Sequence, residues 1–228
     1  MESKGLFIVL EGIEGSGKST QARLLGDWLT AASIPHLLTR EPGGTSHGEE
    51  IRGLLLHSEA MPAVTELLLM LAARATLLDE LVRPALAAGK VVVADRYDIS
   101  TIAYQGYGRG LPLEDVRRAN AIATGGLEPD LVLLLDAPQS VGEARRATSR
   151  PGEDRIERAG RAFHDRVSEA YGLLAREARN VRRIDATVAT EAVHAGILEE
   201  LRRSFPETFG TRGVQRGSSR LEDVQEDG

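Results

Sequence analysis

The sequence predicts an α/β fold, in which helices flank a five-stranded parallel sheet. Two observations support this prediction: short apolar runs alternate with longer helical patterns, and the runs at residues 91–94 and 131–135 are apolar without interruption. Continuous apolar runs are typical of strands buried on both faces, and the alternation of strand and helix indicates βαβ units. The expected strands span residues 6–10, 36–39, 91–94, 131–135 and 181–184. The expected helices span residues 19–32, 63–88, 113–123 and 158–178.

Length and composition indicate how the chain is organised. Its 228 residues, of which 42% are hydrophobic, are enough to bury one sizeable core. We therefore expect a single domain over residues 1–209. Residues 210–228 are rich in Gly, Ser, Arg, Asp and Glu and contain little apolar surface, which predicts a disordered tail.

Charge and cysteine content exclude several classes of protein. The net charge of −6 argues against a general nucleic-acid binder, although local basic clusters can still bind small anions. The absence of cysteine excludes disulfides and thiolate metal sites, and it fits a reducing compartment. The first apolar run ends at Leu10, which is too short for a signal peptide or a membrane span. We expect a cytoplasmic protein that binds neither nucleic acid nor a membrane.

A phosphate-binding loop follows the first expected strand. Residues 12–19 match the P-loop pattern G-x-x-x-x-G-K-[ST], and a helical pattern follows them, as this motif requires. Glycines let the backbone turn its N–H groups toward phosphate oxygens, and the helix N-terminus favours negative charge. Lys18 is expected to reach the β- and γ-phosphates, and the Ser19 hydroxyl to bind Mg²⁺. The expected ATP-binding residues are Gly12, Ile13, Glu14, Gly15, Ser16, Gly17, Lys18, Ser19 and Thr20.

Carboxylates end two of the expected strands. Asp95 follows the run at residues 91–94, and Asp136 follows the run at residues 131–135. Ligands of α/β sheets bind beyond the carboxyl ends of the strands, so either aspartate could assist Mg²⁺. Asp95 is favoured because Arg96 follows it, which suggests a charged pocket, whereas Ala137-Pro138 after Asp136 suggests a turn.

An arginine-rich segment follows the fourth expected strand. Runs of charge are usually solvated helix faces. In a P-loop enzyme, however, a segment at this position can fold over the phosphates as a lid, exclude water and supply an arginine that stabilises the transferring phosphoryl group. We expect a lid at about residues 142–158. The arginines of this segment are Arg145, Arg146, Arg150, Arg155, Arg158 and Arg161.

Further motifs resemble those of thymidylate kinase of the bacterial type. In family order they are EGIEGSGKST at residues 11–20, TREPGGT at 39–45, AAR at 72–74, DRY at 95–97, ST at 100–101 with AYQG at 103–106, and DRIE at 154–157. The resemblance implies a P-loop nucleoside-monophosphate kinase fold with a lid. It also implies transfer of the γ-phosphoryl group from ATP to dTMP, giving dTDP and ADP, with Mg²⁺ as cofactor and a homodimer as the assembly.

The resemblance implies roles in binding the phosphate and sugar of the acceptor. Glu14 matches the carboxylate that senses the 3′-hydroxyl, and Arg96 matches the catalytic clamp on the acceptor phosphate. Arg40 assists from a segment in which Pro42 has a cis peptide bond in the family. Tyr104 matches the ring that lies against C2′ of the sugar and favours deoxyribose.

Roles in binding the base are implied in the same way. Arg74 matches the arginine that hydrogen-bonds a thymine carbonyl, and Thr101 and Gln105 are implied to line the base pocket. Met70 stands where the family usually has a phenylalanine that stacks on thymine. Methionine packs against a base through its polarizable sulfur but without ring stacking.

The resemblance also extends to the lid and the adenine site. Gly15 occupies the P-loop position where some members carry a catalytic arginine. Members without that arginine supply it from the lid, which implies Arg150 or Arg155 in this sequence. The segment after the last strand resembles the part that touches adenine, here Asp185, Ala186 and Thr187.

Three alternative functions stay open. The acceptor could be another deoxynucleotide such as dUMP. A deoxynucleoside kinase would need a carboxylate base near the 5′-hydroxyl. A P-loop protein that binds nucleotide without turnover would be a regulator rather than an enzyme.

Overall fold

The computed structural model describes residues 5–149 and 154–210 and contains a five-stranded, all-parallel sheet. The strand order is β2-β3-β1-β4-β5. The strands are β1 Leu6–Glu11, β2 His36–Arg40, β3 Val91–Asp95, β4 Leu131–Asp136 and β5 Val181–Asp185. Each one contains an expected strand and extends it by one residue, so the predicted α/β fold and its five-stranded parallel sheet are confirmed.

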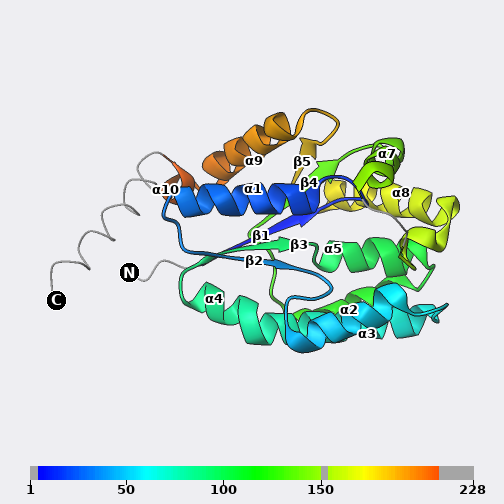
Figure 1. Ribbon diagram of the computed structural model, residues 1–228. Helices are drawn as coiled ribbons and strands as arrows, with labels where there is room; N and C mark the ends of the chain where they lie inside the picture. Colours follow the sequence, from blue (N-terminus) through cyan, green and yellow to red (C-terminus); the bar gives the residue numbers. More distant parts are fainter. Residues whose placement is uncertain (1–4, 150–153, 211–228) are drawn as a thin grey trace.

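Helices cover both faces of this sheet (Figure 1). The long helices are α1 Lys18–Ala31, α2 Ser46–His57, α3 Ala63–Leu77, α6 Leu113–Thr124, α7 Gln139–Ser149, α8 Arg161–Glu177 and α9 Thr190–Ser204. The short helices are α4 Arg83–Ala87, α5 Asp98–Thr101 and α10 Pro206–Phe209. The π-helical turns η1 Leu78–Val82 and η2 Ile102–Gly108 and the 3₁₀ turn η3 Glu157–Ala159 complete the described elements.

Alternate residues of the central strands face two separate cores. Phe7 and Val9 of β1 pack in the core that contains η1, α4 and α8. Ile8 and Leu10 pack in the opposite core, with α1, α9 and Phe209 of α10. Because successive side chains of a strand point to opposite faces, a sheet covered on both sides needs an apolar residue at every position. This requirement explains the uninterrupted apolar runs in the sequence.

Several helices differ from the sequence prediction. The long pattern at residues 63–88 is one continuous path through α3, η1 and α4, while Gly160, at φ 85°, separates η3 from the start of α8. The prediction missed α2, whose 12 residues bury only Gly48 and Leu55. It also missed α9, although the spacing of its buried Val193, Ile197 and Leu201 is a readable helical signal.

Within the described residues, none of the helices is both long and apolar enough to cross a membrane.

Candidate active site

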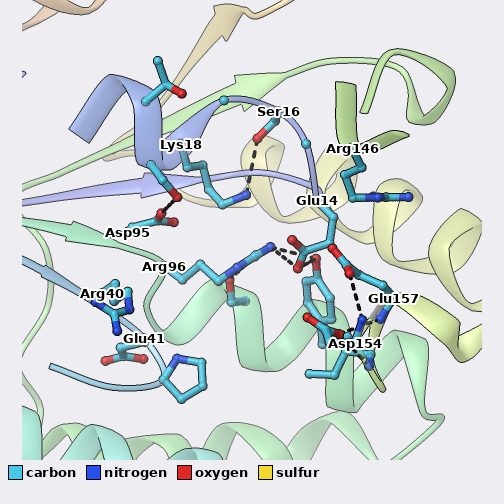
Figure 2. A pocket seen from close by; sticks show the side chains of 18 of the residues that line it. Glu14, Ser16, Lys18, Arg40, Glu41, Asp95, Arg96, Arg146, Asp154 and Glu157 are labelled. Carbon is cyan, nitrogen blue, oxygen red and sulfur yellow. Dashed lines mark hydrogen bonds and ion pairs between the residues drawn. The ribbon is translucent and has the colours of Figure 1, made fainter. Parts of the chain in front are cut away.

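The P-loop connects β1 to α1 and curls around the ammonium group of Lys18 (Figure 2). Lys18 Nζ donates to the carbonyl oxygens of Gly12 at 3.1 Å and Ile13 at 2.7 Å. Gly15 has φ 76°, and a Cβ there would lie 2.3 Å from the carbonyl oxygen of Gly142 in α7. No side chain fits at that position, so the loop and α7 can approach each other closely.

The charge of Lys18 is held in a buried place. Its side chain is only 6% exposed. Burial and the neighbouring charge of Arg96 lower the pKa of Lys18 to about 8, although the carboxylates of Glu14 and Asp95 partly oppose this shift. The negative charge of a phosphate chain beside Lys18 would therefore compensate for the hydration that the ammonium group lost on burial.

The two strand-end aspartates have different surroundings. The Ser19 hydroxyl donates to Asp95 Oδ2 at 2.6 Å, and both residues line the same cavity. Asp136 instead pairs with Arg183 and is half exposed. Paired hard oxygen donors at the start of the P-loop helix suit Mg²⁺. In the described part of the chain, no cluster of three or more acidic or histidine side chains could hold a metal ion.

Arg96 forms a hub directly after β3. Its Nη1 donates to Ser100 Oγ at 3.0 Å and to Tyr171 Oη at 2.9 Å. Its Nη2 donates to Glu14 Oε1 at 2.6 Å and to Tyr104 Oη at 3.0 Å. Figure 2 shows Arg96 and Glu14 pointing toward each other across the gap between the P-loop and the turn after β3. A guanidinium held in this way is positioned before any ligand arrives.

Glu14 is ionised in this arrangement. Burial alone would raise the pKa of Glu14, but the charges of Arg96 and Lys18 outweigh burial and lower the pKa to about 2. Tyr104 adds a hydrogen bond from its hydroxyl to Glu14 Oε1 at 3.2 Å. The carboxylate is therefore an acceptor, which suits a ligand hydroxyl as donor.

Three residues that the sequence interpretation did not assign support the hub. Glu11 is fully buried at the end of β1, and its carboxylate accepts from Ser100 Oγ at 2.7 Å and Tyr171 Oη at 2.9 Å. It also accepts from the backbone N–H groups of Tyr97 and Ser100. These bonds stabilise the turn in which Arg96 adopts φ 78°, a left-handed conformation that is costly for a residue with a side chain. The signal in the sequence that could have identified Glu11 is an acidic residue directly after the apolar run at residues 6–10.

The segment after β2 forms the side of the cavity that holds Arg40. The peptide bond between Glu41 and Pro42 is cis, as the resemblance implies. Arg40 is half exposed, and its Nη2 lies 2.9 Å from both carboxylate oxygens of Glu49. Arg52 donates to the carbonyl oxygen of Pro42 at 2.8 Å and also lines the cavity, although the sequence interpretation did not include it.

The residues implied to bind the base lie together around one part of the cavity. Met70, Arg74, Thr101 and Gln105 all line it. Arg74 is 2% exposed, and its guanidinium donates to Glu41 Oε2, to Asn120 Oδ1 and to the carbonyl oxygen of Tyr97. These bonds hold the Arg74 guanidinium in place, and within the described residues they leave one N–H of Nη1 to donate to a ligand.

The lid segment places its arginines in different ways. Arg150 lies outside the described residues. Arg155 is held at the base of the segment, where it donates to the carbonyl oxygen of Leu55 at 2.8 Å and to Glu66 at 2.6 Å. Arg145 and Arg146 of α7 line the cavity instead, and the charge of Arg146 contributes to the low pKa of Glu14. The expected extent of the lid, about residues 142–158, includes residues 150–153, which are also outside the described residues.

The predicted adenine segment turns back on itself. The backbone N–H and hydroxyl of Thr187 both donate to Asp185 Oδ1. In the described residues, the cavity is lined at this end by Val188, Thr190 and Val193 rather than by residues 185–187. Residues 185–187, which the resemblance implies to touch adenine, therefore lie next to the residues that line the cavity and not among them.

All these parts surround one cavity of about 580 Å³. A P-loop that can hold a triphosphate forms one side, and the Arg96 hub and the residues implied to bind the base form the other. Cationic side chains concentrate between the two. The arrangement can bring two anionic phosphates together between cationic side chains.

Comparisons with known proteins agree with this geometry. A family model for thymidylate kinase matches residues 10–197. The chain is 48% identical over 209 residues to a thymidylate kinase of Synechococcus sp. (strain CC9902), a match that covers 88% of this chain and 99% of the relative. A thymidylate kinase of Pelotomaculum thermopropionicum is 46% identical over 200 residues, covering 86% of this chain and 92% of the relative.

A solved structure shows the same likeness. The crystal structure of thymidylate kinase from Ehrlichia chaffeensis superposes with a TM-score of 0.73 at 29% identity, covering 86% of this chain and 98% of that one. The match of the family model over most of the chain, together with relatives that are nearly half identical over almost their whole length, shows that this chain belongs to the thymidylate kinase family.

Proposed function

We propose that the cavity binds ATP and dTMP together and transfers the γ-phosphoryl group in line, with Mg²⁺, to give dTDP and ADP. As a member of the thymidylate kinase family, the protein is a nucleoside-monophosphate kinase that phosphorylates dTMP. The observation that carries the proposal is the Arg96 hub, because it places a fixed guanidinium between the P-loop and the base-binding residues.

The donor site is the P-loop with the loop after β5. Lys18 would exchange its bonds to loop carbonyl groups for bonds to the β- and γ-phosphates. Ser19 and Asp95 would hold Mg²⁺, which supplies charge neutralisation on the phosphates when it is bound. The proposed ATP-binding residues are Gly12, Ile13, Glu14, Gly15, Ser16, Gly17, Lys18, Ser19, Thr20, Asp185, Ala186 and Thr187.

The acceptor site is the Arg96 hub with the base-binding residues. Arg96 and Arg40 would hold the acceptor phosphate, Glu14 would accept from the 3′-hydroxyl, and Tyr104 would exclude a 2′-hydroxyl. An ionised phosphate is already a nucleophile, so positioning and electrostatic stabilisation supply the rate. The proposed acceptor-binding residues are Glu14, Arg40, Pro42, Met70, Arg74, Arg96, Thr101, Tyr104 and Gln105.

The lid would supply the cation that stabilises the moving phosphoryl group. We keep Arg150 and Arg155 as the catalytic candidates, together with Lys18 and Arg96. The close contact of Gly15 with Gly142 supports this choice, because it leaves no room for a P-loop arginine. Arg155 would have to leave Glu66 in order to reach the phosphates.

A homodimer and a cytoplasmic location complete the proposal. The homodimer is supported by exposed apolar side chains on three neighbouring helices, α2, α3 and α6, of which α3 packs against both of the others. These side chains are Leu54, Val64, Leu68 and Ile122. The lack of cysteine in the 228 residues supports a reducing compartment.

A coupled assay of ADP release with a panel of acceptors tests the proposed function. We expect turnover with dTMP, weaker turnover with dUMP and none with thymidine. Burial of the thymine methyl contributes roughly 0.8 kcal/mol, so preference over dUMP should be on the order of tenfold to a few hundredfold. Equal use of dUMP would contradict the choice of dTMP, and turnover with thymidine alone would indicate a nucleoside kinase. Binding of ATP without turnover of any acceptor would indicate a regulator.

A further inference from the structure

A buried carboxylate outside the proposed site residues touches the base pocket from behind. Glu66 of α3 has no exposed surface. Its Oε1 accepts from Gln105 Nε2 at 2.8 Å and from Arg109 Nε at 3.1 Å. Its Oε2 accepts from Arg109 Nη2 at 2.9 Å and from Arg155 Nη1 at 2.6 Å. Glu66 therefore links one cavity-lining residue, Gln105, to two arginines.

Glu66 is ionised in this environment. Burial alone would raise the pKa of Glu66, but the hydrogen bonds from Arg109 and Gln105, the charge of Arg109 and the bond from Arg155 outweigh burial and lower it. An ionised carboxylate can only accept hydrogen bonds. The group of Gln105 that faces Glu66 must then be its NH₂ group rather than its carbonyl oxygen.

The orientation of the Gln105 amide follows from this contact. The oxygen and nitrogen of an amide are similar in shape, and their assignment depends on the hydrogen-bond partners. With Nε2 turned to Glu66, Oε1 is the polar atom left for the cavity that Gln105 lines. Among the described residues, no donor uses Oε1. Gln105 is 1% exposed, so this oxygen is a nearly desolvated acceptor.

Arg74 presents the complementary group in the same cavity. Its Nε–H and both Nη2–H groups donate to Glu41 and to the carbonyl oxygen of Tyr97, and one Nη1–H donates to Asn120. The amide of Asn120 is itself oriented, because its Nδ2 donates to the carbonyl oxygen of Asp98. Within the described residues, one Nη1–H of Arg74 is left as a donor.

We infer that Glu66 determines base selectivity by holding the Gln105 amide with its oxygen toward the base, so that the pocket accepts a pyrimidine imide and rejects cytosine. Thymine and uracil present an N3–H donor and an O4 acceptor, which match Gln105 Oε1 and the free N–H of Arg74. Cytosine presents a lone pair at N3 and an amino group at C4, so both contacts become unfavourable. Glu66 is a positioning residue here, because it acts through Gln105 without touching the substrate. The inference rests on the proposed dTMP kinase function.

Glu66→Gln tests the inference because it replaces one oxygen atom by an NH₂ group and frees the Gln105 amide. In this variant the oxygen of the new side-chain amide should remain between Arg109 and Arg155, so its NH₂ group should face Gln105. The Gln105 amide should then turn over and present its own NH₂ group to the base. We expect the ratio of kcat/KM for dTMP to that for dCMP to fall by about tenfold or more, since a buried mismatched polar pair costs about 1–3 kcal/mol. The ratio of dTMP to dUMP should stay within about twofold, because both bases carry N3–H and O4.

Two further variants separate this role from a structural one. Arg109→Met removes a partner of Glu66 without touching Gln105. It should lower stability and, at a pH at which Glu66 stays ionised beside its remaining partner Arg155, leave the ratio of dTMP to dCMP unchanged. The exchange variant Glu66→Gln/Gln105→Glu keeps one negative charge for the arginines and returns an acceptor to the cavity, so it should restore the wild-type ratio.

The outcomes distinguish the inference from the proposed function. If the wild type fails to phosphorylate dTMP, the proposed function is wrong. If wild type uses dTMP and folded Glu66→Gln keeps the wild-type ratio of dTMP to dCMP, the inference is overturned. If Glu66→Gln does not fold, the exchange variant decides: the wild-type ratio supports the inference, and loss of selectivity in the folded exchange variant overturns it.

Discussion

At the scale of single residues, the site depends on charges that are held out of water. Lys18 and Arg96 are cations, Glu14 is an anion, and the three lie within one network in which mutual attraction opposes the effect of burial, which disfavours charge. Such a network is ordered before substrate binds, which reduces the reorganisation needed during phosphoryl transfer. Two predictions belong to this scale.

The first prediction is that ATP binding weakens above the pKa of Lys18. In the protein without nucleotide, Lys18 has a pKa of about 8. Bound phosphate anions raise this pKa, so the complex holds the proton of Lys18 more tightly than the unliganded protein does. Affinity is therefore highest below pH 8 and falls as pH rises, by up to about tenfold per pH unit. Calorimetry with a non-hydrolysable ATP analogue between pH 7 and 9.5 measures this dependence.

Lys18→Arg is the matched control for this measurement. Arginine stays protonated throughout this range, so the variant should bind the analogue more weakly at pH 7 but with little change up to pH 9.5. A wild-type dissociation constant that is the same at pH 7 and pH 9 would contradict the prediction.

The second prediction is that the ring of Tyr104, not its hydroxyl, rejects ribonucleotides. The ring lies 4.9 Å from the Arg96 guanidinium carbon and is 4% exposed, so it cannot move aside easily. Tyr104→Ala should relax the preference for dTMP over ribo-TMP by about 5- to 150-fold, because a buried unpaired hydroxyl costs about 1–3 kcal/mol. Tyr104→Phe should keep the preference and lower kcat/KM for both, since Arg96 loses one partner. Equal preference in wild type and Tyr104→Ala would remove this role.

At the scale of elements, the lid segment and its supports decide which arginine reaches the phosphates. The segment begins in α7, which touches the P-loop at Gly15, and it returns through residue 155, whose backbone N–H donates to the carbonyl oxygen of Leu56. The two ends are therefore attached to different parts of the cavity. A change in the position of the lid segment would therefore move its arginines relative to the proposed ATP and dTMP.

We predict that alanine at the catalytic lid position lowers kcat by about 10³- to 10⁵-fold with little effect on ATP binding. The variants Arg150→Ala and Arg155→Ala identify the residue, and Arg155→Ala should in addition lower the melting temperature, because it removes a partner of buried Glu66. Arg161→Ala is the matched control, since that side chain is 88% exposed. Full turnover in both single variants and in the double variant would show that the lid does not supply the arginine.

At the scale of the whole molecule, α10, the last helix of the described residues, closes one of the two cores. Phe209 is 1% exposed, and its ring lies 6.2 Å from that of Trp28 in α1. We predict that Phe209→Ala lowers the free energy of unfolding by about 3–5 kcal/mol. Ending the chain at Gly210 should leave stability and activity unchanged, because residues 211–228 offer little apolar surface. Urea denaturation measures both effects, and a large loss on truncation would contradict the second.

The proposed homodimer is also tested at this scale. Leu68 on α3 is 59% exposed, and Val64 lies one turn before it with 54% exposure. We predict that Leu68→Glu shifts the protein from dimer to monomer, because a charge in an apolar interface loses its hydration. Leu173→Glu on α8, at a side chain of 44% exposure, is the control and should keep the dimer. Analytical ultracentrifugation gives the assembly directly, and a monomeric wild type would contradict the proposal.

The five strands, part of the helices and the P-loop could be predicted from the sequence, because they depend on local chemistry. A strand covered on both faces must be apolar throughout, and a backbone that cradles phosphate needs glycines, a lysine and a hydroxyl at fixed spacing. The sequence therefore indicated buried strands at residues 91–94 and 131–135 and a phosphate-binding loop around Lys18. The family motifs also named Arg74, Arg96 and Tyr104 as a set, although not their contacts.

Only the tertiary structure decided how those side chains are held. Glu11 and Tyr171, 160 positions apart, meet beneath Arg96, and Glu66 joins Gln105 to Arg155 across two elements. No local pattern predicts such pairs, because the contacts depend on which face each helix presents after it has packed on the sheet. The sequence by itself determined the fold and the chemistry of the phosphate cradle. Packing decided the orientation of the groups that choose the acceptor, since orientation arises from partners that are distant in the chain.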